Sequence, residues 1–161
     1  MSMDRHVGIG DLGVVGGGAG VLVTHSLGSC VAVVMYDAAR GVGGMLHFQL
    51  PESRLNAERA SSQPALFADT GIERLVASVV AQGGVPKRSR IYLIGGSQMV
   101  VEMQAAQIGK RNALAAKKAL WNLGLPLQAE HLGGTVSRTV RLNLATGAVC
   151  VFIGGKEMVE L

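Results

Sequence analysis

The sequence predicts an α/β protein in which much of the sheet structure is antiparallel, and three observations carry this prediction. Short valine-rich runs alternate with turn residues over most of the chain. Two of these runs, 30–36 and 42–48, are separated by a polar turn and predict a hairpin. Two longer segments, 64–82 and 109–123, have the composition and the apolar spacing of helices.

Size and composition are those of a folded protein. The chain has 161 residues, of which 48% are hydrophobic and 16% charged, and we expect one domain over residues 1–161. The net charge of +4 permits an acidic partner, but the basic residues are scattered, which argues against nucleic acid. The N-terminus lacks the pattern of a secretory signal, and the longest apolar run falls far short of the roughly 20 residues that span a bilayer. We therefore expect a cytoplasmic protein with no membrane insertion.

The first half of the chain predicts a sheet built around one buried strand. Residues 1–20 are glycine-rich and predict a weakly structured lead-in with at most one short edge strand. A strand at 21–24 stops at the polar bend 25–29. The valine-rich run 30–36 then suits a strand buried on both faces, and 42–48 returns as its antiparallel partner.

The second half adds the helices and the remaining strands. Residues 56–63 predict a surface loop, followed by the helix 64–82, which two glycines end. A strand at 90–94 precedes the helix 109–123, with Gly124 as its stop. Further strands are expected at 127–132, 136–144 and 148–153.

Cys30 stands at the head of the buried strand, directly after Gly28 and Ser29. Small residues there let backbone N–H groups converge beside the sulfur, where they favour a thiolate and could hold an oxyanion. The alternative is that a cysteine at a strand start is only a small hydrophobe, and Cys150, among apolar neighbours, fits that description. Two cysteines without a CxxC pattern argue against structural zinc, and in a reducing compartment we expect no disulfide.

His47 is the best candidate for a base acting on Cys30. If Ala38 and Ala39 form the tip of the hairpin, Cys30 lies directly across from His47, with Cβ atoms about 4.5–5.5 Å apart. A register change of one residue would put His47 on the other face, and a loop of another length is equally compatible with the sequence. Thr24, at the end of the preceding strand, could orient the imidazole.

The other histidines have weaker cases. His6 lies in the lead-in, His131 could face a sheet surface, and the direction of His25 relative to Cys30 is left open by the bend between them. His47 itself could instead be a strand-end histidine that binds backbone. The glycine clusters match neither nucleotide-binding pattern, and no dense metal-ligand motif occurs, so neither a nucleotide nor a metal cofactor is expected.

The chain resembles the CheD chemoreceptor glutamine deamidases of bacterial and archaeal chemotaxis. The matching segments follow in family order over about residues 21–153 and are 23–33, 43–51, 67–69, 94–99, 108–112, 133–134 and 137–141. The resemblance implies that Cys30 is the nucleophile, His47 the base and Thr24 the third member of the site. It also implies an α-β-β-α layered sandwich similar to toxin-type deamidases.

The activity that the resemblance implies is hydrolysis of glutamine side chains to glutamate on the cytoplasmic helices of methyl-accepting chemotaxis receptors, without a cofactor. Many members of the family also bind a CheC-type phosphatase that acts on phosphorylated CheY, so a binding module is the alternative function. His25 and Ser26 stand where the family commonly has leucine and glycine, which would place an extra imidazole close to the site. Ser97 and Val100 depart from the usual Gly-Gly-Ala-x-Met-Phe. Receptor or phosphatase docking is expected to differ at these positions.

Overall fold

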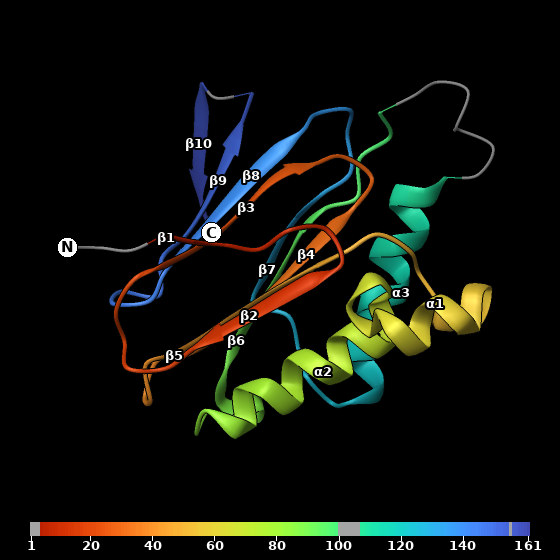
Figure 1. Cartoon of the computed structure of the whole chain (residues 1–161). Coiled ribbons are helices and arrows are strands. Elements are labelled where there is room, and N and C mark those ends of the chain that lie inside the picture. The colour runs from red at the N-terminus through yellow and green to blue at the C-terminus, as the bar shows by residue number, and fades with distance from the viewer. Residues whose placement is uncertain (1–3, 100–106, 155) are drawn as a thin grey trace.

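The computed structural model describes residues 4–99, 107–154 and 156–161. These residues form two sheets and a small group of helices (Figure 1). The strands are β1 (Asp4–His6), β2 (Asp11–Val15), β3 (Val21–Leu27), β4 (Val31–Asp37), β5 (Val42–Phe48), β6 (Arg90–Gly95), β7 (Ala129–Leu132), β8 (Arg138–Asn143), β9 (Val149–Ile153) and β10 (Glu157–Glu160). The α-helices are α1 (Ala57–Ser62), α2 (Ala68–Ala81) and α3 (Ile108–Asn122), and short 3-10 turns occur at Ser53–Asn56, Pro64–Leu66 and Pro86–Arg88.

Each sheet has five strands. The first sheet has the order β1-β3-β8-β9-β10 and the second has the order β2-β5-β4-β6-β7. The pairs β1–β3 and β6–β7 are parallel, and the other pairings are antiparallel. The predicted α/β class with largely antiparallel sheets is therefore confirmed.

The layers follow the order sheet, sheet, helices. Figure 1 shows α1, α2 and α3 gathered on one side, with β3, β8, β9 and β10 on the other. Buried side chains form one apolar cluster between the two sheets and a second between the second sheet and helices α2 and α3. Among the described residues no helix covers the outer face of the first sheet, so the outer helical layer expected there is not found.

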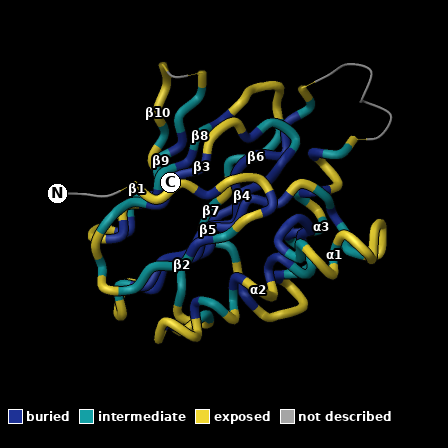
Figure 2. The backbone as a smooth tube through the Cα atoms, viewed as in Figure 1, coloured by how far each residue is buried: buried dark blue, intermediate teal, exposed yellow. Residues whose placement is uncertain are grey.

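Strand β4 lies at the centre of this arrangement and is buried along its whole length (Figure 2). Val31, Val33 and Met35 point into the cluster under the helices, and Ala32 and Val34 into the cluster between the sheets. A strand covered on both faces has no polar face, which explains its continuous apolar sequence. No helix among the described residues is long and apolar enough to cross a membrane.

The N-terminal segment is more ordered than its sequence predicts. Instead of a weakly structured lead-in it forms β1, which lies parallel to β3, and β2, which pairs with β5. Val7 between them is 3% exposed, and its N–H donates to the Val23 carbonyl at 2.8 Å. Pairing with two existing sheet edges compensates here for the weak strand propensity of a glycine-rich sequence.

Two further segments differ from the sequence prediction. The expected loop 56–63 contains the helix α1, which begins where the Asn56 side chain accepts a hydrogen bond from the Arg59 N–H at 3.0 Å. An asparagine at this position supplies an acceptor that the first turn of a helix lacks. Strand β10, for which no strand was predicted, pairs with β9 at the edge of the first sheet.

The β4–β5 hairpin has a different register from the one expected. Asp37 pairs with Val42, so residues 38–41 form the loop, and His47 lies opposite Ala32 rather than Cys30. A tight turn with Ala38 and Ala39 at its tip would need left-handed φ values that alanine disfavours. The left-handed position is instead taken by Gly41, with φ +64°.

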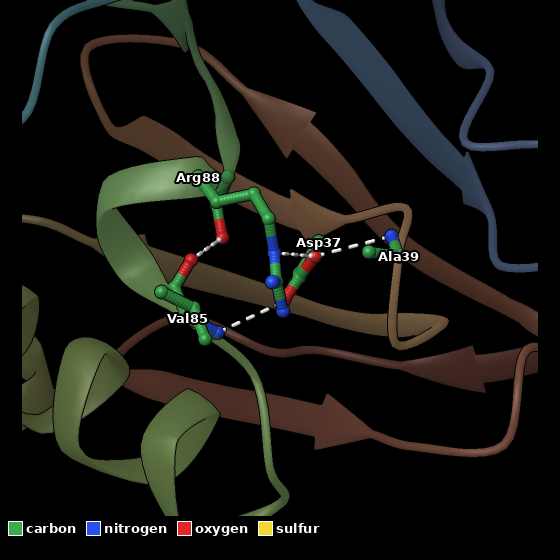
Figure 3. A network of polar contacts seen from close by, with 5 residues as sticks. Asp37, Ala39, Val85 and Arg88 are labelled. Atoms are coloured by element: carbon green, nitrogen blue, oxygen red, sulfur yellow. Dashed lines mark hydrogen bonds and ion pairs between the residues drawn. The ribbon is translucent and has the colours of Figure 1, made fainter.

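A buried carboxylate holds this turn in place (Figure 3). The Asp37 side chain is fully buried and accepts hydrogen bonds from the N–H groups of Ala39 and Val85 at 3.1 and 2.8 Å. The Arg88 guanidinium donates to both carboxylate oxygens at 3.0 and 2.8 Å and thereby lowers the pKa of Asp37. These contacts attach the hairpin turn to the segment after α2 and so help fix the register that positions His47.

Candidate active site

A hydrogen bond between the two sheets brings Thr24 and His47 together. Thr24 lies on β3 of the first sheet and His47 on β5 of the second, and their side chains are 0% and 1% exposed. The Thr24 Oγ1 and His47 Nδ1 atoms are 2.7 Å apart. The predicted pairing of these two residues is therefore present in the structure.

The contacts of Thr24 determine which nitrogen of His47 carries the proton. The Thr24 hydroxyl also lies 2.6 Å from the carbonyl oxygen of Val7, which can only accept a hydrogen bond. Since the hydroxyl has one proton and donates it to Val7, it must accept from the Nδ1–H of His47. The lone pair of the imidazole is then on Nε2, an atom that is buried and has no hydrogen-bond partner among the described residues.

Cys30 lies on the same sheet face as His47. It precedes β4 by one residue, is 8% exposed, and belongs with Ala32 and Met45 to the cluster between the sheets. Because Ala32 lies directly opposite His47, Cys30 is its diagonal neighbour across the hairpin. Such neighbours have Cα atoms about 7–8 Å apart and Cβ atoms somewhat closer. The observed register therefore differs from the predicted one by two residues, so His47 stays on the same sheet face as Cys30.

The turn that carries Cys30 is held through its carbonyl groups. The Ser97 N–H donates to the Gly28 carbonyl and the Gly96 N–H to the Cys30 carbonyl, both at 2.9 Å. The Asn112 side chain donates to the Ser29 carbonyl at 3.0 Å. Among the described residues, the N–H groups of Ser29 and Cys30 find no acceptor on another residue. The carbonyl groups of the turn are thus held by the loop after β6 and by α3, while the Cys30 N–H contacts its own thiol.

Asn112 is a part of the site to which the sequence interpretation assigned no role. It lies on the buried side of α3 and is 0% exposed, and its Nδ2 also donates to the Gln49 carbonyl at 2.8 Å. One amide group therefore joins the turn before Cys30 to the chain just after His47. The signal in the sequence was a polar residue at the same helical spacing as the buried Gly109, Ala116 and Leu120.

The departure at Ser97 is part of a buried polar network. Ser97 is 1% exposed, accepts a hydrogen bond from Arg138 at 2.8 Å and donates to the Val136 carbonyl at 2.6 Å. Arg138 is 4% exposed and also donates to the Gly95 and Gly133 carbonyls at 3.2 and 2.8 Å. This network supports the loop whose N–H groups hold the Cys30 turn. Val100, the other departure in this motif, lies outside the described residues.

A cavity of about 360 Å³ opens beside this turn. Ser29, Gln49 and Leu50 line one part of it, and Ser97, Gln98 and Met99 line another. The first turn of α3 closes it with Gly109, where a Cβ atom would lie 2.4 Å from the Ser97 carbonyl oxygen. A glycine is therefore required for this close approach, and the cavity lies against Ser29, which directly precedes Cys30, and against Gln49, two residues after His47.

Burial keeps both reactive side chains neutral near pH 7. It raises the pKa of the Cys30 thiol, an effect that hydrogen bonding from the Cys30 N–H opposes only in part. Burial lowers the pKa of His47 to about 4. The pair is therefore thiol and neutral imidazole at rest, and the imidazole is in the form that can accept a proton.

The remaining histidines contact residues other than Cys30. His25, expected to add an imidazole close to the site, is exposed and stacks on His6 with ring centroids 5.3 Å apart. It follows Thr24 on β3 and so faces the opposite side of the sheet. Its neighbour Ser26 has φ +59° at a bulge in β3. The Nδ1 atom of His131 accepts a hydrogen bond from Arg138 at 2.8 Å.

The fold and the site define a mixed α/β protein whose buried cysteine shares a sheet face with a threonine-bound histidine. A family model described as "CheD chemotactic sensory transduction" matches residues 49–152. The chain is 46% identical over 148 residues to the "Probable chemoreceptor glutamine deamidase CheD 2" of Anaeromyxobacter dehalogenans, covering 92% of this chain and 93% of that protein. The chain belongs to the CheD family, as its sequence motifs predicted.

Other relatives match over similar lengths. The "Probable chemoreceptor glutamine deamidase CheD" of Solibacter usitatus is 41% identical over 151 residues, covering 94% of this chain and 89% of that protein. The protein of the same name from Pyrococcus abyssi is 41% identical over 160 residues, covering 97% and 96%. A crystal structure of Bacillus licheniformis hypothetical protein YfiH matches 69% of this chain and 46% of its own with a TM-score of 0.42 and 16% identity, too low to establish a common fold.

Proposed function

We propose that this protein hydrolyses glutamine side chains of chemoreceptors to glutamate, using Cys30 as nucleophile, His47 as base and Thr24 as the residue that orients the base. The observation that carries the proposal is the Val7–Thr24–His47 chain of hydrogen bonds. It leaves the Nε2 lone pair of His47 unpartnered on the sheet face that it shares with Cys30. The names of the relatives supply the substrate class.

The first chemical step joins the enzyme to the substrate. His47 Nε2 takes the proton of the Cys30 thiol as the sulfur attacks the side-chain carbonyl carbon of the glutamine. The carbonyl becomes an oxyanion, and the N–H groups of Ser29 and Cys30, beside Gly28, are the donors that we propose stabilise it. Because both groups are neutral at rest, proton transfer accompanies attack rather than preceding it.

The second half of the reaction releases the products. The oxyanion collapses, the carbon–nitrogen bond breaks, and His47 returns its proton to the departing nitrogen, which leaves as ammonia. His47 then takes a proton from water as its oxygen attacks the thioester carbon. The carbon–sulfur bond breaks, the thiolate regains the proton from His47, and the carboxylic acid formed releases its proton to water to leave glutamate. The steps use only the side chains described and water, and each event adds one negative charge to the receptor.

We propose a single domain, supported by the Thr24–His47 hydrogen bond that joins the two sheets. A cytoplasmic location and a relationship to toxin-type deamidases are predicted by the family resemblance. A CheC-type phosphatase partner is predicted by the family resemblance. The alternative in which the chain is only a binding module is disfavoured by the complete set of Cys30, His47 and Thr24.

The test is to incubate the protein with receptor cytoplasmic fragments and to map Gln-to-Glu conversion by mass spectrometry. We expect Cys30→Ala to lose conversion and Cys150→Ala, which changes the other cysteine, to retain it. Equal conversion by wild type and Cys30→Ala would refute the catalytic assignment. No conversion by wild type, together with tight binding of a CheC-type phosphatase, would favour the binding module.

A further inference from the structure

The solvent side of helix α3 carries large apolar side chains among basic ones. The buried side of the helix consists of Gly109, Asn112, Ala116 and Leu120. On the opposite side, four residues follow one another at spacings of four, three and four, which aligns them along the helix axis. We call Lys110, Leu114, Lys117 and Trp121 the α3 stripe. Leu114 is 56% exposed and Trp121 is 83% exposed.

The charged residues of α3 are all basic, whereas the acidic Glu130 lies beside the stripe on β7. Arg111 and Lys118 flank it, and no acidic residue occurs between residues 108 and 122. Lys117 forms an ion pair with Glu130 at 3.1 Å, but both side chains are nearly half exposed, so the pair contributes little and can exchange partners. A tryptophan exposed to this extent within a basic surface is typical of an interaction site rather than of a solvated helix face.

Part of the stripe borders a groove that lies next to the cavity beside Ser29. A groove of about 600 Å³ lies between α3 and the loops that follow β6 and β7, and Lys110, Leu114 and Lys117 form part of its wall. Gln98 lines this groove and also lines the cavity beside Ser29. A polypeptide with a side chain in the cavity would therefore have neighbouring residues within reach of the groove.

We propose that the α3 stripe docks an acidic helical segment of the receptor next to the glutamine that is converted; this inference rests on the proposed function. Leu114 and Trp121 would contact apolar side chains of that segment, and Lys110 and Lys117 its carboxylates. The stripe runs from residue 110 to residue 121, a rise of about 16 Å along the helix axis, which matches about three turns of a partner helix. The basic residues of the stripe favour an acidic partner. Because Gln98 lines both the groove and the cavity beside Ser29, we expect this partner to be the substrate rather than an unrelated protein.

An anionic membrane is the other surface that attracts a basic amphipathic helix. The structure favours the receptor, because three residues of the stripe line the groove that shares Gln98 with the cavity beside Ser29. The experiment compares Trp121→Ala and the double variant K110E/K117E with two matched controls on α2. Val80→Ala removes an apolar side chain that is 54% exposed, and Arg74→Glu reverses an exposed cation.

Each protein is assayed for kcat and KM on a receptor cytoplasmic fragment and on a short glutamine peptide. We expect the stripe variants to raise KM for the receptor about tenfold or more, with kcat and peptide hydrolysis within about twofold of wild type. Added salt should raise KM for wild type more than for K110E/K117E, because it screens exposed charges. The two controls should match wild type.

Binding is measured separately from catalysis by titrating the receptor fragment into proteins that also carry Cys30→Ala. A stripe variant that binds as tightly as its parent, or an unchanged KM for the receptor, overturns the docking proposal. If the stripe variants lose binding to phosphatidylserine vesicles but keep the receptor Kd of their parent, the stripe binds a membrane surface and the docking proposal is overturned. Weaker receptor binding by the stripe variants supports docking even where no glutamine is converted. The absence of conversion would refute only the proposed catalysis.

Discussion

Replacing Thr24 with valine removes one hydroxyl and keeps the shape of the side chain. In the structure this hydroxyl joins the Val7 carbonyl at 2.6 Å to the His47 Nδ1–H at 2.7 Å, and both contacts are buried. Each polar group left without a partner costs about 1–3 kcal/mol. We expect Thr24→Val to lower the free energy of unfolding by about 2–4 kcal/mol.

The same change should affect catalysis more than stability alone explains. Without its acceptor, the Nδ1–H of His47 no longer fixes the tautomer that leaves the Nε2 lone pair toward Cys30. General base catalysis contributes about 10²–10⁴ in rate, so we expect kcat for receptor deamidation to fall about a hundredfold at a temperature where the variant remains folded. Conversion is followed by mass spectrometry, and the folded fraction by urea unfolding.

Two variants separate this role from a general effect of substitution. Thr24→Ser keeps the hydroxyl and should retain most of the activity. Thr139→Val makes the same change in a partly exposed threonine whose hydroxyl lies 3.5 Å from His25 Nδ1, and it should leave kcat unchanged. If Thr24→Val kept kcat within about threefold of wild type, the derivation of the His47 tautomer from the contacts of Thr24 would be wrong.

Three further predictions concern pH, the Cys30 turn and the β3 bulge. Burial lowers the pKa of His47 from its ordinary 6.5 to about 4, so between these values the unfolded chain binds a proton that the folded chain does not. The contribution of His47 to the free energy of unfolding is therefore fully present above pH 6.5, and the free energy should fall by about 3 kcal/mol as the pH is lowered to 4. The same fall in His47→Gln, measured by urea unfolding, would contradict this. Asn112→Leu removes the donor to two buried carbonyls and should lower kcat about tenfold or more, whereas Asn122→Leu, at the exposed end of the same helix, should not; equal rates would exclude a positioning role. Ser26 has φ +59°, so Ser26→Gly should raise the free energy of unfolding by up to about 1 kcal/mol. If urea unfolding gave a lower free energy for this variant, the bulge would be unstrained.

The hairpin that carries Cys30 and His47 could be predicted from the sequence because its determinants are local. A continuous valine-rich run identifies β4, and the return strand 42–48 was predicted with the bounds that the structure gives. The register was wrong because the loop 38–41 places Gly41 at its left-handed position and is held by distant residues, namely Arg88 and the Val85 N–H on Asp37. Only the parity of the register decides which face His47 occupies, so a two-residue error left the site interpretation intact.

The parts of the site that the sequence did not reveal come from other elements. The segment around Val7 lacks strong strand formers, yet its carbonyl completes the contacts of Thr24. Asn112 lies on a helix far along the chain, and its two carbonyl partners belong to turns with no sequence signature for such a contact. Side-chain to backbone contacts of this kind leave almost no pattern in a single sequence.

The two sheets supply different parts of the proposed chemistry. Cys30 and His47 belong to the same hairpin of the second sheet and would keep their shared face in any state that preserves it. The group that fixes the protonation of His47 belongs to the first sheet, whose strand β3 contacts the second sheet through Thr24. Loosening the first sheet would therefore leave the thiol and imidazole near each other but lose the orientation of the base. Catalysis should consequently depend on packing between the sheets, so substitutions that disturb this packing should lower kcat before they unfold the hairpin.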